Sequence, residues 1–295
     1  MSGSVPLRVT TQPRHGGRWT SLSSGGREWL WRGEATGRDR VVPGDAFVDA
    51  GGLEECVPTV RGVPDHGEAW SRPWRSLGPG SAVVECPAFT LARRLTEEDG
   101  AVVARYRLSA DPGYRFVWAA HALLDLSPAA RLEAPAGTPT RIYPEPAGGG
   151  RPVTAWPGGR RLDRFGPDDG TALGAILVGC PDVRVADGPD SLRLRLDCPD
   201  QPCSTALWRN LRGWPSPVPY RSIGVEPMLG AVFDVAEATV DGPTAAVVPA
   251  AGEVEWRLTI SAHRHSSNPD RSADDRELLP RPDGGPVRDK RFPSG

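Results

Sequence analysis

The chain has 295 residues, of which 38% are hydrophobic and 24% charged, and its formal net charge is −2. This near-neutral balance excludes a nucleic-acid binder, which needs a basic field. No stretch reaches the length of a membrane span, and residues 1–11 lack the apolar segment of a signal peptide. We therefore expect no membrane partner and a cytoplasmic location.

Apolar and polar residues alternate with a period of two in several segments, which predicts strands with one buried face. The alternation is found within 102–108, 192–197 and 254–261, and further β-rich runs are found within 81–86, 89–95 and 114–126. Glycine, proline and aspartate punctuate the gaps, as in Asp111-Pro112-Gly113. Many short strands with turn signals and little helical periodicity indicate an all-β fold, a large antiparallel sandwich or barrel.

The pattern is continuous enough to predict one domain over residues 1–263. Within it, residues 134–150 are rich in proline, glycine and alanine, and we interpret them as a loop. Residues 264–295 carry mainly charge, proline, serine and glycine, which predicts a polar C-terminal tail that is extended or disordered. The five cysteines are irregularly spaced, which favours reduced thiols; a Cys198–Cys203 disulfide is the alternative.

Three short islands of polar and aromatic residues lie far apart in the sequence, in or beside extended segments. Together they supply two imidazoles, at least two carboxylates and several indoles, a set suited to proton transfer on a sugar ring. The islands are Pro64–Trp70, Trp118–His121 and Ile223–Pro227.

These islands, with two glycine-led segments near the N-terminus, resemble the aldose 1-epimerase (galactose mutarotase-like) family in order and spacing along most of residues 14–262. The N-terminal segments are Gly16–Leu22 and Gly26–Trp31, and the histidine loop combines Gly51-Gly52, Cys56–Thr59 and Asp65–Glu68. The last motif extends from Ile223 to Gly230. Each motif alone is weakly specific, whereas four in the family's order are considerably stronger.

The resemblance implies a large antiparallel β-sandwich with a concave sugar-binding sheet, and a free sugar as the small-molecule partner. It implies Glu226 as the base that accepts the anomeric hydroxyl proton, and His121 as the acid that protonates the ring oxygen. His66 would either hydrogen-bond a ring substituent or stabilise the developing charge. No metal or organic cofactor is expected, since proton transfers alone open the ring.

Further substrate-binding residues are predicted around these motifs. Asp65 either contacts the sugar or braces the loop around His66. Arg72 stands in for an arginine that the family carries in a motif missing from this sequence. The indoles nearest the motifs are the stacking candidates: Trp70, Trp118 and Trp214. Asp163 is the candidate for the family's substrate-binding aspartate.

Plainer interpretations stand beside these assignments. His121 taken alone is more often a structural strand histidine, and Glu226 taken alone an exposed turn carboxylate. His263-Arg264-His265 has no third metal ligand nearby, which favours a solvated strand end. For the whole chain we expect an aldose 1-epimerase-like isomerase; the alternatives are a non-catalytic carbohydrate-binding or sugar-sensing protein and, less favoured, a glycosidase or lyase on the same scaffold.

Overall fold

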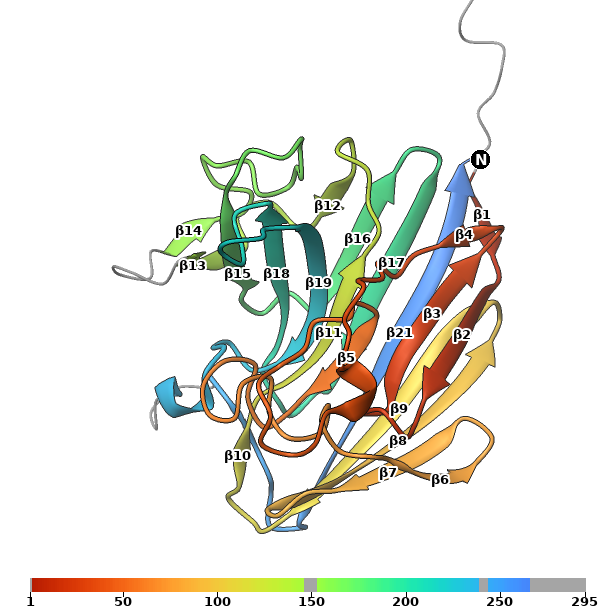
Figure 1. The fold of residues 1–295 in the computed structure, drawn as a ribbon, viewed down its shortest axis with the longest axis vertical. Helices are drawn as coiled ribbons and strands as arrows, with labels where there is room; N and C mark the ends of the chain where they lie inside the picture. Colours follow the sequence, from red (N-terminus) through yellow and green to blue (C-terminus); the bar gives the residue numbers. More distant parts are fainter. Residues whose placement is uncertain (1, 146–152, 239–243, 266–295) are drawn as a thin grey trace, which may run out of the picture.

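The computed structural model describes residues 2–145, 153–238 and 244–265 (Figure 1). Within these ranges the regular structure consists of strands and two single-turn 3-10 helices, η1 (Arg38–Arg40) and η2 (Val235–Glu237). Two large antiparallel sheets pack against each other, which confirms the predicted all-β sandwich. No helix in the described part of the chain is long and apolar enough to cross a bilayer.

One layer is a nine-stranded sheet built mostly from the middle and the end of the chain. Its strands follow the spatial order β12-β16-β17-β21-β9-β8-β7-β6, and β1 also pairs with β21. The members are β1 (Ser2–Val5), β6 (Arg75–Gly78), β7 (Ser81–Glu85), β8 (Phe89–Glu98), β9 (Ala101–Ala110), β12 (Arg131–Glu133), β16 (Asp182–Asp187), β17 (Asp190–Asp197) and β21 (Glu253–His265).

The second layer is a ten-stranded sheet that brings N-terminal strands beside strands from the second half of the chain. Its order is β14-β13-β15-β18-β19-β11-β5-β3-β2, with β4 paired to β3. The members are β2 (Leu7–Gln12), β3 (Arg18–Ser24), β4 (Arg27–Glu28), β5 (Leu53–Cys56), β11 (Trp118–Leu124), β13 (Pro139–Glu145), β14 (Val153–Ala155), β15 (Ala172–Leu177), β18 (Cys203–Leu211) and β19 (Arg221–Leu229). A separate pair joins β10 (Arg115–Phe116) to β20 (Ala246–Val247).

The core lies between the sheets and follows from the period-two alternation in the sequence. Side chains at alternate positions of β9, β17 and β21 are buried there, as the sequence predicts: Val102, Ala104, Tyr106, Leu108, Leu192, Leu194, Leu196, Val254, Trp256, Leu258 and Ile260. The intervening arginines, aspartates and glutamates of these strands face outward. Burying one apolar face of each strand is what holds the layers together.

The ten-stranded sheet is buried on both faces at its centre. On β11, the even-numbered residues from Trp118 to Leu124 join the core between the sheets, whereas Ala119 belongs to a second apolar cluster. That second cluster includes Met228 of β19 and Phe233, which lie under the loops on the outer face. Successive side chains of a strand point to opposite faces, so His121 lies on this outer, loop-covered face.

Two boundaries differ from the sequence prediction. Residues 134–150 are not a continuous loop, because Pro139–Glu145 form β13 and pair with β15 over six residues. Thr140 and Ile142 are buried there, and this short alternation went unrecognised among prolines and glycines. The predicted tail begins too early, since Arg264 and His265 still pair within β21. The rest of the predicted tail lies outside the described residues.

All five cysteines are free thiols, so the reduced state favoured by the sequence is the one observed. Cys198 and Cys203 are near neighbours, yet the Cys203 sulfur contacts the backbone carbonyl oxygen of Cys198 at 3.5 Å. Burial raises the pKa of the Cys56 thiol well above its usual value. The Cys56 thiol therefore acts as a small apolar group in this fold.

Candidate active site

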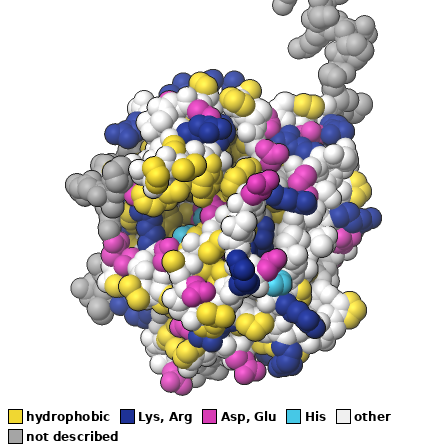
Figure 2. Space-filling model, viewed as in Figure 1, with side chains coloured by type: hydrophobic (Ala, Val, Ile, Leu, Met, Phe, Trp, Pro, Cys, Tyr) yellow, Lys and Arg dark blue, Asp and Glu magenta, His cyan; other side chains and the backbone are white. Residues whose placement is uncertain are grey.

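The outer face of the ten-stranded sheet is hollowed by a cavity of about 620 Å³. Figure 2 shows a hollow on the viewed face that is edged by hydrophobic side chains, with acidic side chains beside it. The cavity lies over strands β11, β18 and β19 and under the loops that cover them. Its lining residues are Phe47, Asp49, Val60, Arg61, Asp65, His66, His121, Glu145, Leu207, Trp208, Trp214, Pro215, Tyr220, Glu226 and Phe233. This volume suits a small organic ligand.

The cavity contains both residues predicted to carry the chemistry, on neighbouring strands. The register of β11 with β19 pairs Ala119 with Met228 and Leu123 with Gly224, which sets His121 opposite Glu226. Residues that face each other across antiparallel strands point to the same side and have Cβ atoms about 4.5–5.5 Å apart. Nδ1 of His121 lies 3.0 Å from Oε1 of Glu226.

Both side chains are shielded from solvent, His121 being 8% and Glu226 2% exposed. Although Nδ1 of His121 and Oε1 of Glu226 are close, they do not form a hydrogen bond, because the oxygen lies off the direction of the Nδ1–H bond. Nδ1 faces Glu226, so Nε2 is the nitrogen available to a ligand. The second carboxylate oxygen of Glu226 likewise remains an acceptor.

Carboxyl groups flank His121 on two sides, since the β5–β11 register sets Glu54 opposite it as well. Burial by itself would lower the pKa of His121, but the Glu226 carboxylate, together with Asp49 and Glu54, raises the pKa to about 9. Burial raises the pKa of Glu54 to about 7 even though Arg38 opposes that effect. The imidazole is therefore a proton donor at neutral pH.

Glu226 owes its position partly to Gly224, two residues earlier on the same face of β19. A Cβ atom at Gly224 would lie 2.4 Å from Oε1 of Glu226 and 3.0 Å from Cβ of Trp208. No such approach is tolerated between real side chains, so a larger residue would displace the carboxylate. The glycine leaves the space that the Glu226 side chain occupies beside His121.

His66 reaches the same cavity from the loop between β5 and β6. Its ring centroid is 5.0 Å from that of His121, and Phe47 stacks on it at 3.6 Å. Burial lowers the pKa of His66 and His121 adds to this, although the Asp65 carboxylate 3.1 Å away opposes it. The two imidazoles are thus driven apart in pKa, which is typical of acid and base assignments in enzyme sites.

The backbone around His66 is unusual and tightly held. His66 itself adopts φ 59°, in the left-handed region, and Gly67 follows with φ 75°. A Cβ atom at Gly67 would lie 2.1 Å from the carbonyl oxygen of Val57, so only glycine fits against this neighbouring segment. The amide of His66 donates to the carbonyl of Val60 at 3.1 Å, which closes the loop.

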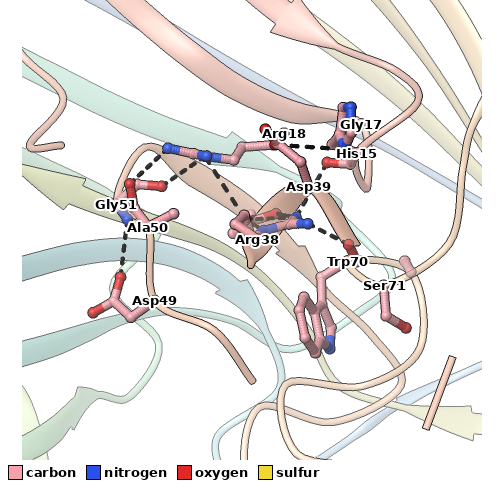
Figure 3. A network of polar contacts seen from close by, with 12 residues as sticks. His15, Gly17, Arg18, Arg38, Asp39, Asp49, Ala50, Gly51, Trp70 and Ser71 are labelled. Atoms are coloured by element: carbon pink, nitrogen blue, oxygen red, sulfur yellow. Dashed lines mark hydrogen bonds and ion pairs between the residues drawn. The ribbon is translucent and has the colours of Figure 1, made fainter. Parts of the chain in front are cut away.

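Two arginines, the buried Arg38 and the partly buried Arg18, tie the covering loops to the sheet (Figure 3). Arg18 donates to the carbonyl oxygens of Ala50 and Gly51 at 2.6 and 2.9 Å, which fixes the segment that carries Asp49. Arg38 donates to Trp70 O at 3.1 Å and, through Nε and Nη2, to both carboxylate oxygens of Glu54 at 2.9 Å. The loop bearing His66 and the strand beside His121 are therefore held by one guanidinium.

Two residues predicted to bind substrate lie elsewhere. Trp118 is fully buried between the sheets, where its indole N–H donates to Glu55 at 2.9 Å, so it is unavailable for stacking on a ligand. It is three positions from His121 and faces the opposite side of β11. Arg72 donates to Glu68 at 3.0 Å and is not among the described lining residues, so it does not replace the family's arginine there.

Of the remaining residues predicted to bind substrate, some line the cavity and others lie outside it. Asp65 and Trp214 line the cavity, and Trp214 is 43% exposed. Trp70 is buried beneath Phe47, which its ring meets edge-on at 4.9 Å. Asp163 pairs with Arg161 at 2.9 Å and is likewise not among the described lining residues, so it is not the substrate-binding aspartate of this cavity.

Several lining residues were missed by the sequence prediction. The arginine of the cavity is Arg61, five residues before His66 in the same loop, and it pairs with Glu145 at 3.4 Å. Asp49 directly precedes the Ala50–Gly52 segment, accepts from the Gly51 amide at 3.0 Å and contacts the Tyr220 hydroxyl. Proximity to the sequence motifs was the available signal for all three, since Asp49 precedes Gly51 by two residues, Arg61 follows Thr59 by two and Tyr220 precedes Ile223 by three.

No group of three His, Cys, Asp or Glu side chains in the described ranges converges as a metal-ligand set. The chemistry that the cavity offers from its own residues is proton transfer. It holds a charged imidazole with raised pKa, a carboxylate beside it, and a second imidazole with lowered pKa. Aromatic side chains around them provide flat apolar surfaces against which a ring can pack.

Comparisons with known proteins identify the fold. No protein-family model and no curated protein sequence matches the chain. Among solved structures, a protein of Escherichia coli K12 whose name proposes an aldose 1-epimerase matches with TM-score 0.68 and 12% identity, over 90% of this chain and 100% of its own.

Two further structures give the same picture. The Slr1438 protein of Synechocystis sp. matches with TM-score 0.65 and 16% identity, over 90% of this chain and 96% of its own. A galactose mutarotase related enzyme of Lactobacillus acidophilus matches with TM-score 0.58 and 14% identity, over 90% of this chain and 98% of its own. At such identities the likeness establishes the fold alone: the chain is a large antiparallel β-sandwich like these solved structures.

Proposed function

We propose that the protein is a mutarotase, an aldose 1-epimerase-like isomerase that interconverts the anomers of a free sugar. One observation carries the proposal: His121 and Glu226 lie 3.0 Å apart on facing positions of β11 and β19, at a cavity of about 620 Å³. The mutarotase-like fold of the matched structures supports the same reaction class, as does the order of the sequence motifs.

The reaction needs an acid and a base beside one carbon atom, because the ring oxygen and the anomeric hydroxyl are both bonded to C1. Glu226 accepts the proton of the anomeric hydroxyl while His121, through Nε2–H, donates a proton to the ring oxygen. The C1–O5 bond breaks and its electron pair goes to O5, which leaves an open-chain aldehyde and a C5 hydroxyl.

Rotation about C1–C2 presents the other face of the aldehyde. His121 then takes the proton of the C5 hydroxyl as that oxygen attacks C1, and Glu226 returns its proton to the carbonyl oxygen. The protons balance over the cycle and no other reactant is consumed. The raised pKa of His121, about 9, keeps the donor protonated at neutral pH.

The surrounding side chains have binding roles in this scheme. His66, with its lowered pKa, is neutral and can donate or accept a hydrogen bond to a ring hydroxyl. Asp65 holds the Nδ1 side of His66, and Trp214 supplies an exposed ring at the cavity for the apolar side of the sugar. Arg61, paired with Glu145, takes the place that the sequence assigned to Arg72.

Exchange NMR between anomers, or polarimetry of freshly dissolved sugar, tests the proposal. The wild-type protein should accelerate anomer exchange, and E226Q and H121N should each lose roughly 10²–10⁴-fold of that acceleration. E253Q and H263N are matched controls, because both side chains lie on β21 of the other sheet. Sugar binding without acceleration by the wild-type protein would refute catalysis and leave a carbohydrate-binding protein.

A further inference from the structure

The cavity is acidic. Its described lining residues include four carboxyl side chains: Asp49, Asp65, Glu145 and Glu226. The positive charges that oppose them are the Arg61 guanidinium and the His121 imidazolium. His66 does not add to these, because burial lowers its pKa. The charge of the cavity is therefore negative at neutral pH.

Both cations already have carboxylate partners. Nη1 of Arg61 lies 3.4 Å from Oε2 of Glu145, and Nδ1 of His121 lies 3.0 Å from Oε1 of Glu226. A phosphate or carboxylate on the sugar would have to displace one of these partners, and only the His121–Glu226 pair is shielded from water. It would also be repelled by the other carboxylates, most strongly where water is excluded.

The other two carboxylates have no cation in direct contact, although Asp49 helps to raise the pKa of His121, and Arg61 and His121 help to lower the pKa of Asp65 from a longer distance. Asp49 accepts hydrogen bonds from the Gly51 amide and the Tyr220 hydroxyl, and neither donor is charged. Asp65 faces His66, the imidazole with the lowered pKa. Within the described ranges neither aspartate forms an ion pair with an arginine. A cationic ligand would supply the missing partner.

Aromatic rings complete the surroundings of such a cation. The lining includes five of them: Phe47, Trp208, Trp214, Tyr220 and Phe233. The face of an aromatic ring attracts an ammonium group, and the attraction grows when water is excluded. Carboxylates and aromatic faces together favour a protonated amine over a neutral hydroxyl and over any anion.

We infer that the sugar taken by this site carries a protonated amine, so that the substrate class is an amino sugar such as glucosamine. The inference rests on the proposed function of the cavity and deepens it. It also excludes sugar phosphates and uronates as preferred substrates, since the cavity offers them no unpaired cation among its described residues.

The test compares sugars that differ mainly in charge. Glucosamine and glucose differ by an ammonium group in place of one hydroxyl, N-acetylglucosamine removes the charge, and glucose 6-phosphate and glucuronate reverse it. Binding is measured by calorimetric titration, and kcat/KM of anomer exchange by NMR. Glucosamine should exceed glucose roughly tenfold or more in affinity, and both anionic sugars should bind more weakly than glucose.

A variant that removes the charge of Asp65 tests whether that carboxylate causes the preference for glucosamine. D65N should reduce the ratio of glucosamine to glucose affinity several-fold, whereas E133Q, an exposed glutamate on β12, should leave that ratio unchanged. High salt should also reduce the ratio. Equal affinity for glucosamine and glucose, or tighter binding of an anionic sugar, would overturn the inference even if anomer exchange is catalysed. Amine-selective binding without exchange would instead refute the proposed reaction and leave the charge preference standing.

Discussion

Replacing Glu226 with glutamine should release the proton that His121 holds. The folded protein raises the pKa of His121 from 6.5 to about 9. One pKa unit corresponds to about 1.4 kcal/mol, so the charged imidazole is favoured by about 3 kcal/mol relative to water. Burial opposes this shift, and Glu226 is the main cause that raises the pKa. In E226Q the burial remains and the principal carboxylate is gone.

We therefore expect the pKa of His121 in E226Q to fall from about 9 to its ordinary value of 6.5 or below. Long-range ¹H–¹⁵N NMR of the imidazoles, recorded from about pH 5 to about pH 10, measures this directly. The chain has five histidines, and H121N assigns the signal. D65N serves as the control, because Asp65 contacts His66 and its loss should shift mainly that histidine.

Protonation of His121 should also make the free energy of unfolding depend on pH. Since the folded pKa of His121 lies above its unfolded value of 6.5, its stabilisation is fully present below pH 6.5 and is lost as pH rises through about 9. The free energy of unfolding, from urea titrations, should fall across that window in the wild-type protein and much less in E226Q. Glu54, whose pKa is raised to about 7, titrates mainly at lower pH in both proteins.

Two outcomes would refute this reasoning. A His121 pKa in E226Q within about half a unit of the wild-type value would show that Glu226 does not hold the proton. A wild-type stability that is flat between pH 6.5 and 9 would show that the imidazole titrates alike in the folded and unfolded chains.

Three further predictions concern positioning and binding. G224A should lower kcat of anomer exchange roughly tenfold or more with little change in KM, because the added Cβ displaces the Glu226 carboxylate. G159A is the control, because Gly159 has open space around it. An unchanged kcat in G224A would contradict the argument. G67A should lower the free energy of unfolding, measured by urea titration, by about 2 kcal/mol or more. Gly67 has a positive φ, and a Cβ atom there would lie 2.1 Å from the carbonyl oxygen of Val57. A G67A variant as stable as the wild-type protein would contradict this prediction. W214A should raise KM about two- to tenfold with kcat nearly unchanged, and an effect confined to kcat would argue against a stacking role.

The sequence predicted the fold class, and it singled out the two side chains that the structure places 3.0 Å apart in the cavity. Period-two alternation in segments such as those of β9 and β21 makes one face of each strand apolar, and burying those faces yields a sandwich. His121 and Glu226 could be singled out because each lies in a short polar motif within an extended segment, and the two motifs follow a family order. β13 was missed because proline and glycine around it obscured its brief alternation.

Only the tertiary structure decided which side of each strand faces the cavity. Trp118 and His121 share one strand, and their separation of three residues already places them on opposite faces. Which of the two faces the second sheet depends on the packing of the whole layer, and that packing put Trp118 inside the core. Asp49 and Arg61 flank β5, whereas Tyr220 comes from the distant loop between β18 and β19, and no local pattern encodes their convergence. A side chain's local periodicity is set by its own strand, but its neighbours are set by strand order and register.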